Sequence, residues 1–450
     1  MKIAVIGTGY VGIVTAVGLA EFGHAVIGAD KVSEKIEKIS RGDVPIYEPG
    51  LEELLKSNLK KGTLAFSSDL NGTIQAADVI FVCVGTPQGD DGSADMSQIE
   101  EVSRLIAENL NGYKVVVEKS TVPVKTSSWI KRTISLYKKS DQEFDVASNP
   151  EFLREGSAVA DFLKPDRIII GVETERARDM LTKIYAGFKD RLFITNIDTA
   201  ELIKHASNSF LAMKISYINL MANLCERTNA DVEQVAKGMG LDPRIGGLFL
   251  KAGLGYGGSC FPKDLKALIK IGEDLGVNMN LLKETDRVNV ERTRLFLEKI
   301  KRALWILKDK KIAVLGLAFK PETDDIREAP AIKLIKDLLN EGAILRLYDP
   351  EAQANMKELF PEDKVRITYA KTPYEAANGV NALLLCTEWK EFSELDLGKI
   401  KGLERVLRTR PRQDQGPHGQ SHHHRRPQYL SARGREKARI RVLLRRPKIR

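Results

Sequence analysis

A chain of 450 residues with 43% hydrophobic residues is large enough for two or three domains, each with its own core. No stretch reaches the length of a membrane span, and the first residues enter a strand pattern at once, so we expect neither a membrane segment nor a signal peptide. The four cysteines are few and widely spaced, which argues against a disulfide framework and a zinc site, and no metal is expected. Free cysteines favour a reducing cytoplasm.

The net charge of +9 comes from the end of the chain. Residues 402–450 hold 13 Arg and 2 Lys against 3 acidic residues, a charge of +12, which leaves −3 for residues 1–401. This tail also holds four of the six histidines and has no regular hydrophobic period before about residue 437. We interpret it as a disordered segment, of the kind that a shifted reading frame produces, with no catalytic group and no nucleic-acid partner. The alternative is a basic arm that binds nucleic acid or an anionic surface.

The first thirty residues carry a dinucleotide-binding pattern. A short apolar run predicts a buried strand, residues 13–22 predict a helix, and residues 25–30 predict a second strand that ends in Asp30. Between the first strand and the helix lies Gly7–Gly12 (GTGYVG), whose glycines permit a tight turn and the close approach of a pyrophosphate to the helix N-terminus. Asp30 would accept hydrogen bonds from ribose hydroxyls and repel a 2′-phosphate. NAD is therefore favoured over NADP, although the following Lys31 weakens this preference.

Three later strand patterns lead into polar loops. The strands span residues 78–84, 114–118 and 144–148, and the loops begin at Gly85, Ser120 and Asn149. Ligands of doubly wound sheets bind at the carboxyl ends of strands, so we expect these loops to line a site. A further αβ pattern from residues 311 to 386 is typical of a second nucleotide-type fold, but it lacks a full glycine fingerprint and should bind something other than the dinucleotide.

The segment Gly253–Asp264 (GLGYGGSCFPKD) places a lone cysteine after a run of glycines. A helix that starts near Pro262 would hold Cys260 at its N-terminus, where the helix dipole and free N–H groups favour a thiolate. Asp264 would return to the same face one turn later. This arrangement favours a covalent thiol mechanism, and the alternative is a buried structural cysteine beside a flexible loop.

Residues 198–227 predict one long helix, which could link two domains and form a subunit interface. Lys204 and Asn208 are four residues apart and share a face of this helix. His205 lies on another face, and we interpret it as structural.

Together these motifs resemble the UDP-glucose 6-dehydrogenases, within the UDP-glucose/GDP-mannose dehydrogenase family. The resemblance covers residues 1 to about 401 in order and includes the run Ala318–Glu328 (AFKPETDDIRE). It implies an α/β fold with three domains: a Rossmann-type NAD-binding domain over residues 1–196, a central helical dimerisation domain over 197–300, and a Rossmann-like UDP-sugar-binding domain over 301–401. It also implies a homodimer that oxidises the C6 alcohol of UDP-glucose to a carboxylate with two NAD⁺.

The resemblance further implies how the site residues act. Cys260 would attack an intermediate aldehyde, and the thiohemiacetal would lose a second hydride to give a thioester. Lys204, Asp264 and Asn208 would manage protons and the oxyanion, and Thr121 and Glu151 would activate the hydrolytic water. The implied cofactor-binding residues are Gly7, Gly9, Tyr10, Val11, Gly12, Asp30, Gly85, Thr86, Thr121, Glu155, Lys263 and Arg327. The implied substrate-binding residues are Glu151, Phe152, Leu153, Glu155, Lys204, Asn208, Arg244, Tyr256, Gly257, Phe319 and Lys320, with Arg244 reaching across the dimer.

One departure from the family concerns the end of the chain. Family members end with a strand that carries an Asp-Gly-Arg motif, then a helix and a strand, and residues 402–450 match none of this. Two further interpretations therefore stay open. The substrate could be another nucleotide sugar, such as GDP-mannose or a UDP-N-acetylhexosamine, or the protein could bind a nucleotide sugar with impaired turnover.

Overall fold

The computed structural model describes residues 1–89, 92–400 and 405–408. These residues form two compact units. The first unit comprises residues 1–210, 259–283 and 322–324, and the second comprises residues 211–258, 284–321 and the described residues from 325 onward. The predicted disorder of the tail concerns residues that lie outside the described ranges, apart from 405–408.

The first unit is built on an eight-stranded sheet with the order β3-β2-β1-β4-β5-β6-β7-β8. The sheet is parallel from β3 to β6, as the predicted doubly wound pattern requires, whereas β7 pairs with β6 in the antiparallel sense. The central strands β4 and β5 are buried at every position, which explains their continuous apolar runs. The strands are β1 (Lys2–Ile6), β2 (Ala25–Ala29), β3 (Leu64–Ser67), β4 (Val79–Val82), β5 (Lys114–Glu118), β6 (Phe144–Ser148), β7 (Ile168–Gly171) and β8 (Leu192–Thr195).

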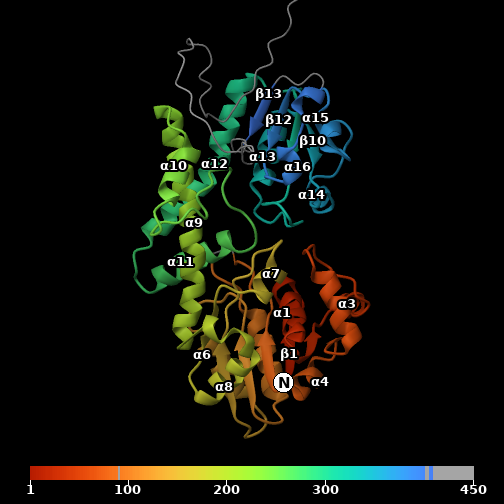
Figure 1. Cartoon of the computed structure of the whole chain (residues 1–450), viewed down its shortest axis with the longest axis vertical. Coiled ribbons are helices and arrows are strands. Elements are labelled where there is room, and N and C mark those ends of the chain that lie inside the picture. Colours follow the sequence, from red (N-terminus) through yellow and green to blue (C-terminus); the bar gives the residue numbers. More distant parts are fainter. Residues whose placement is uncertain (90–91, 401–404, 409–450) are drawn as a thin grey trace, which may run out of the picture. The chain divides into compact units, whose positions relative to one another are not determined.

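Helices cover both faces of this sheet, because apolar side chains from the strands alternate between two cores. Helices α1, α3, α7 and α8 pack into one core, and α4, α5 and α6 pack into the other. Figure 1 shows several of these helices around the sheet. The helical segments are α1 (Tyr10–Glu21), α2 (Ser33–Ser40), α3 (Leu51–Lys61), α4 (Leu70–Ala76), α5 (Ser97–Glu108), α6 (Thr126–Tyr137), α7 (Ala158–Leu163), α8 (Glu175–Ile184) and the 3₁₀ helix η1 (Ala186–Arg191).

The predicted long helix is confirmed as α9, which spans Ile197–Thr228. Its first part belongs to the first unit and its remainder to the second. The other helices of this region are α10 (Val232–Gly240), α11 (Phe261–Asp274) and α12 (Asn280–Leu304). Helix α11 begins directly after Cys260, with Pro262 in its first turn, as the sequence predicts.

The second unit contains a five-stranded parallel sheet with the order β11-β10-β9-β12-β13. Its first strand, β9, has neighbours on both sides, as β1 has in the larger sheet. The strands are β9 (Lys311–Leu315), β10 (Ile344–Tyr348), β11 (Ile367–Tyr369), β12 (Ala382–Leu385) and β13 (Arg405–Arg408). The helical segments are α13 (Pro330–Asn340), α14 (Gln353–Leu359), α15 (Pro373–Ala377), α16 (Lys390–Ser393) and the 3₁₀ helix η2 (Leu397–Lys399).

Strand β13 differs from the sequence prediction, which begins the tail at residue 402. It pairs with β12 through four residues, Arg405–Arg408. The apolar pair Val406 and Leu407 stands between arginines, and this run is too short to be recognised as a strand from its pattern. Backbone pairing with a neighbouring strand supplies what the local pattern lacks.

Candidate active site

The glycine turn after β1 is required by close backbone packing. Gly7 has a positive φ of 92°, and a Cβ on Gly12 would lie 1.8 Å from the carbonyl oxygen of Gly7. Gly9 differs, since no described heavy atom lies within 4 Å of the position that its Cβ would take. Gly7 and Gly12 therefore shape the turn, and Gly9 leaves open space beside the N-terminus of α1. This geometry suits a pyrophosphate bound at the helix N-terminus.

Asp30 follows β2 and faces this turn. Its carboxylate accepts hydrogen bonds from the Thr8 N–H at 3.0 Å and the Thr8 hydroxyl at 2.9 Å, and it pairs with Lys35 at 2.9 Å. Burial acts to raise the pKa of Asp30, but the contacts with Lys35, Thr8 and Val32 outweigh it and hold the pKa below its usual value. Lys31, which the sequence analysis weighed against Asp30, instead pairs with Glu101 at 2.9 Å. Lys35 is the basic neighbour that sequence reasoning missed.

A second missed residue is Glu48, which is buried in the loop before α3. Its carboxylate accepts hydrogen bonds from the Tyr10 hydroxyl and from the Gly156 N–H, the latter at 2.7 Å. Burial and this acidic neighbour raise the pKa of Tyr10, so the phenol stays protonated and donates. Glu48 thus joins the start of α1 to the loop that follows β6. The local sequence gives one signal, an acidic residue between Tyr47 and Pro49 in a loop with few charges.

The loops after β4 and β5 are held together by their own side chains. The Thr86 hydroxyl donates to the Thr121 carbonyl at 2.9 Å, and the Ser120 hydroxyl donates to the Val84 carbonyl at 2.8 Å. From α9, the Nε2 of the buried His205 donates to the Val122 carbonyl at 2.7 Å. The expectation that these loops meet at the carboxyl ends of neighbouring strands is therefore confirmed for β4 and β5.

A buried ion pair joins α9 to the loop after β6. The Lys204 ammonium lies 2.8 Å from Glu151, and the two side chains are 4% and 5% exposed. Glu151 also accepts from the Leu153 N–H at 2.6 Å. Burial acts to lower the pKa of Lys204, but Glu151, Cys260 and Asp264 outweigh it and raise the pKa, so the lysine stays charged.

Cys260 stands at the N-terminus of α11, and Asp264 lies one turn later, with its N–H bonded to the Cys260 carbonyl at 2.8 Å. The buried Asp264 carboxylate accepts from the Asn208 amide at 2.7 Å and pairs with Lys263 at 2.8 Å. The structure therefore brings Lys204 and Asn208 of α9 to Glu151 and Asp264 respectively. Sequence reasoning had only the helical spacing of these two residues.

The electrostatics of Cys260 differ from the sequence expectation of a thiolate. Burial raises the pKa of the thiol to about 11, with further raising by Glu151 and Asp264, while Lys204 and Ser259 lower it. Desolvation and the two carboxylates therefore outweigh Lys204 and Ser259. A raised pKa favours the protonated thiol at neutral pH.

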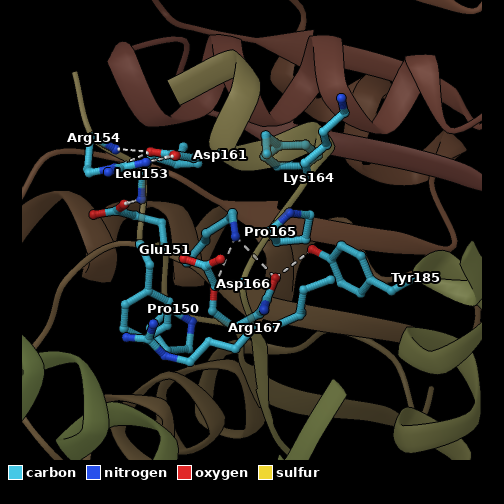
Figure 2. A pocket seen from close by; sticks show the side chains of 15 residues that line it. Pro150, Glu151, Leu153, Arg154, Asp161, Lys164, Pro165, Asp166, Arg167 and Tyr185 are labelled. Atoms are coloured by element: carbon cyan, nitrogen blue, oxygen red, sulfur yellow. Dashed lines mark hydrogen bonds and ion pairs between the residues drawn. The ribbon is translucent and has the colours of Figure 1, made fainter. Parts of the chain in front are cut away.

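A pocket of about 150 Å³ lies beside the loop after β6. Figure 2 shows Glu151, Arg167 and Tyr185 among the side chains that line it. The ring of Phe152 lies 4.1 Å from the Arg167 guanidinium and 5.3 Å from the Lys204 ammonium. The lining residues are Lys119, Asn149, Pro150, Glu151, Phe152, Leu153, Arg154, Asp161, Phe162, Lys164, Pro165, Asp166, Arg167, Ile168 and Tyr185.

The predicted residue Glu155 lies between two hydroxyl groups. Its carboxylate accepts from Ser259 at 3.2 Å and from Thr323 at 3.4 Å. Because Ser259 precedes Cys260, Glu155 ties the loop after β6 to the cysteine segment. Three chain segments that are distant in sequence thus meet at one carboxylate.

Several predicted residues belong to the second unit. Arg244 is mostly exposed and pairs with Asp242 at 2.6 Å. Phe319 lies against the glycine loop, since a Cβ on Gly257 or Gly258 would come within 3.1 Å of its side chain. The second-unit residues among the predicted site are Arg244, Tyr256, Gly257, Phe319, Lys320 and Arg327.

Comparison with known protein families identifies three consecutive matches. They are the NAD binding domain of the UDP-glucose/GDP-mannose dehydrogenase family over residues 1–189, its central domain over 198–291 and its UDP binding domain over 313–410. The chain belongs to this family. The last match extends into the predicted tail, and it covers β13.

Relatives within the family are similar over almost their whole length. The UDP-glucose 6-dehydrogenase of Rhizobium meliloti (strain 1021) is 47% identical over 408 residues, which cover 89% of this chain and 92% of the relative. TuaD, a UDP-glucose 6-dehydrogenase of Bacillus subtilis (strain 168), is 43% identical over 89% of this chain and 87% of its own.

A solved UDP-glucose dehydrogenase from Pyrobaculum islandicum superimposes with a TM-score of 0.87 at 39% identity, covering 92% of this chain and 94% of its own. The UDP-D-ManNAc dehydrogenase from Pyrococcus horikoshii gives a TM-score of 0.82 at 29% identity, over 93% and 97%.

The family matches cover the glycine turn in the first unit and the sheet in the second. The glycine turn and Asp30 lie within the residues that match the NAD binding domain, and their geometry suits NAD. The second sheet lies within the match to the UDP binding domain. Within residues 1–89, 92–400 and 405–408, no helix combines the length and apolar character that a membrane crossing needs.

Proposed function

We propose that this dehydrogenase oxidises UDP-glucose to UDP-glucuronate, with NAD⁺ as the acceptor. The balance is one alcohol, two NAD⁺ and one water giving one carboxylate, two NADH and three protons. The substrate is supported by the curated relatives at 43–47% identity, which are UDP-glucose 6-dehydrogenases. The mechanism is supported by the buried Lys204–Glu151 pair, because both of its charges affect the pKa of Cys260. The cluster of Lys204, Glu151 and Cys260 is the observation that carries the mechanism.

NAD⁺ supplies the hydride acceptor for both oxidation steps. The chain contributes the turn at Gly7–Gly12 for the pyrophosphate and Asp30 for the adenosine ribose. A carboxylate in this place repels a 2′-phosphate, which accounts for NAD over NADP. Further residues proposed to contact the cofactor are Tyr10, Val11, Gly85, Thr86, Thr121, Glu155, Lys263 and Arg327.

In the first oxidation, the C6 hydroxyl loses a hydride and a proton to give an aldehyde. Lys204 stays charged in its buried site and would stabilise the alkoxide and the later oxyanion. Asn208 and Asp264 are hydrogen-bonded to each other at 2.7 Å, which fixes both side chains next to the cysteine helix. Because its pKa of about 11 leaves little thiolate beforehand, the Cys260 thiol gives up its proton as sulfur attacks the aldehyde carbon, and the aldehyde oxygen gains a proton to become the thiohemiacetal hydroxyl.

The thiohemiacetal then loses the second hydride from carbon and the proton from its hydroxyl group, and becomes a thioester. Hydrolysis requires a water that adds to the thioester carbon while the C–S bond breaks and the thiol is restored. Glu151 would accept the proton from this water, and Thr121 would orient it. Lys204 would stabilise the tetrahedral oxyanion through its charge.

The residues proposed to contact the nucleotide sugar come from several segments of the chain. Phe152, Leu153 and Glu155 lie in the loop after β6, and the others are Arg244, Tyr256, Gly257, Phe319 and Lys320. We further propose three domains with boundaries near residues 196 and 300, followed by the tail from residue 402.

We also propose a cytoplasmic homodimer that forms along α9. Within the second unit this helix exposes Tyr217, Leu220 and Leu224, at 46%, 47% and 54% respectively. Three exposed apolar residues within two turns indicate a surface that a second copy of the chain could cover. In that dimer Arg244 would reach the substrate of the partner.

A second candidate is the oxidation of another nucleotide sugar. The likeness to the UDP-D-ManNAc dehydrogenase at a TM-score of 0.82 favours it, because one fold serves both sugars. A panel of UDP-glucose, GDP-mannose and UDP-N-acetylhexosamines separates the two. Faster NADH formation with any sugar other than UDP-glucose would decide for the alternative.

The mechanism is tested by Cys260→Ser, with Cys225→Ser as the matched control. Cys225 also lies in α9, and its pKa is raised by burial and by Asp231 and Glu226. We expect Cys260→Ser to lose UDP-glucuronate formation and Cys225→Ser to keep it, because a serine cannot form the thioester. Equal uronate yields from the two variants would remove Cys260 from the mechanism. If the unmodified protein binds UDP-glucose but forms no NADH, it is a binding protein with impaired turnover.

A further inference from the structure

The second sheet carries a buried carboxylate that the proposed mechanism does not use. Asp349 follows β10 and has no exposed surface. One of its oxygens accepts from the N–H groups of Leu317 at 2.6 Å and Ala318 at 3.1 Å, and from the indole N–H of Trp389 at 3.2 Å. The other oxygen accepts from the N–H groups of Glu351 and Ala352 at 3.0 and 2.9 Å. Five donors from three strand ends thus converge on one side chain.

Asp349 occupies the same place in its sheet as Asp30 does in the larger one. In both, the glycine after the first strand has a positive φ, 92° at Gly7 and 91° at Gly316, and its N–H bonds the residue before the acid. The two acids differ in exposure. The Asp30 side chain is 14% exposed and can meet a ribose, whereas Asp349 is fully covered. Since its oxygens are already filled by protein donors, Asp349 cannot recognise a ligand directly.

The segment that Asp349 holds leads directly to two proposed substrate contacts. Gly316 is pressed against Thr387, and the Thr387 hydroxyl donates to the Ala318 carbonyl at 2.6 Å. Phe319 follows, with its N–H bonded to the Asp325 carbonyl at 3.1 Å and its ring 5.5 Å from the Lys320 ammonium. Asp349 and Thr387 therefore fix the backbone of Leu317 and Ala318, which directly precedes Phe319 and Lys320.

We propose that Asp349 is a positioning residue for nucleotide-sugar binding. It holds the Leu317–Ala318 backbone so that Phe319 and Lys320 meet the substrate, and it has no part in NAD binding. This inference rests on the proposed function, because it assumes that these two side chains contact the nucleotide sugar. Because Asp349 is buried, it cannot bind a ribose in the way that we propose for Asp30.

The test is Asp349→Asn in the full-length protein. An amide keeps the shape but accepts at one oxygen only, so one group of N–H donors faces an NH₂ group instead. We expect KM for UDP-glucose to rise about ten-fold or more, because several hydrogen bonds to a charged acceptor are lost. KM for NAD⁺ should stay within about two-fold. Amide exchange should accelerate in peptides that cover residues 316–320, and calorimetry should show the same weakening for UDP alone.

Two further variants make the result decisive. Asp363→Asn is the matched control, since exposed Asp363 accepts from three backbone N–H groups at 2.7–3.0 Å, and these belong to residues 365–367 instead of the segment 316–320. It should leave both KM values unchanged. Trp389→Phe removes one hydrogen-bond donor to Asp349 and keeps an aromatic ring, so it should raise KM for UDP-glucose by a smaller factor. It replaces Asp349→Asn as the test if that variant does not fold.

The proposal is overturned if KM for UDP-glucose and KM for NAD⁺ rise together, or if exchange of residues 316–320 stays unchanged in both Asp349→Asn and Trp389→Phe. The UDP calorimetry and the exchange measurement do not need turnover. A failure of the proposed sugar oxidation, seen as absent NADH from the unmodified protein, is therefore distinct from a failure of this inference.

Discussion

Replacing Lys204 with methionine tests whether the buried ion pair with Glu151 has the energetics that the geometry indicates. Methionine has similar length and no charge, so Glu151 would keep its bond to the Leu153 N–H but lose the buried cation at 2.8 Å. Removal of one partner from a buried pair costs about 3–5 kcal/mol of folding free energy, because the other charge stays uncompensated. We therefore expect Lys204→Met to lose about 3–5 kcal/mol and all uronate formation.

The double variant Lys204→Met/Glu151→Gln distinguishes charge from packing. The amide that replaces the Glu151 carboxylate could still accept from the Leu153 N–H, and no unpaired charge would remain. Since a neutral replacement of a buried pair is often close to neutral in stability, we expect the double variant to regain at least half of the loss. It should stay inactive, because both proposed catalytic groups are gone.

The assay is thermal unfolding of the protein without ligands, followed by circular dichroism, beside NADH formation. For a unit of about 240 residues each kcal/mol shifts Tm by about 2–4 °C, so Lys204→Met should lower Tm by about 6–20 °C. The matched control is Lys131→Met, which breaks the exposed pair with Glu173 (46% and 49% exposed) and should change stability by less than about 1 kcal/mol. If Lys204→Met is as stable as Lys131→Met, or if the double variant is no more stable than Lys204→Met, the reasoning about this pair is wrong.

Three further predictions concern the cofactor turn and the thiol. Gly12→Ala should abolish NAD binding and lower Tm, because its Cβ would lie 1.8 Å from the Gly7 carbonyl oxygen. Gly9→Ala should fold normally, because no described atom lies within 4 Å of the position of its Cβ. Calorimetry with NAD⁺ and thermal unfolding check this, and equal stability of the two variants would contradict it. Asp30→Ser should raise the NADP⁺ to NAD⁺ ratio of kcat/KM by about ten-fold or more, since the ionised carboxylate repels the 2′-phosphate, and an unchanged ratio would refute this role. Cys260 has its pKa raised to about 11, so its alkylation by iodoacetamide, measured by peptide mass spectrometry without ligands, should rise with pH well beyond 9. The same shift means that protein stability falls as pH rises from about 9 through 11, because the unfolded thiol ionises first. An alkylation plateau below pH 8 would show that the thiolate is stabilised after all.

The sequence alone determined the elements whose signals are local. The first strand, the glycine turn, the helix and the second strand occupy one stretch of thirty residues, and each follows from the residues next to it. The long helix and the helix start after Cys260 also follow from local periodicity and from Pro262. Membership of the family could be inferred as well, since it depends on motifs that can be read in order along the chain.

Only the tertiary structure decided which side chains meet. Glu48 binds Gly156, which lies 108 residues later, and Lys204 binds Glu151 across 53 residues. Such contacts depend on how helices and loops pack against a common sheet, and no local pattern encodes their distances. The short strand β13 belongs here too, because it is defined by pairing with β12 and not by its own pattern.

The burial of a side chain also could not be predicted from the sequence, and it reversed the expectation that Cys260 is a thiolate. The position of Cys260 at a helix N-terminus favours a thiolate, yet desolvation raises its pKa to about 11. Asp30 and Asp349 make the same point, since both follow the second strand of their sheets. Asp30 is partly exposed and is proposed to bind ribose, whereas Asp349 is buried and its oxygens are occupied by protein donors. Residue type and order are properties of the chain, whereas solvent access is a property of the packed fold, and the chemistry of an ionisable group depends on both.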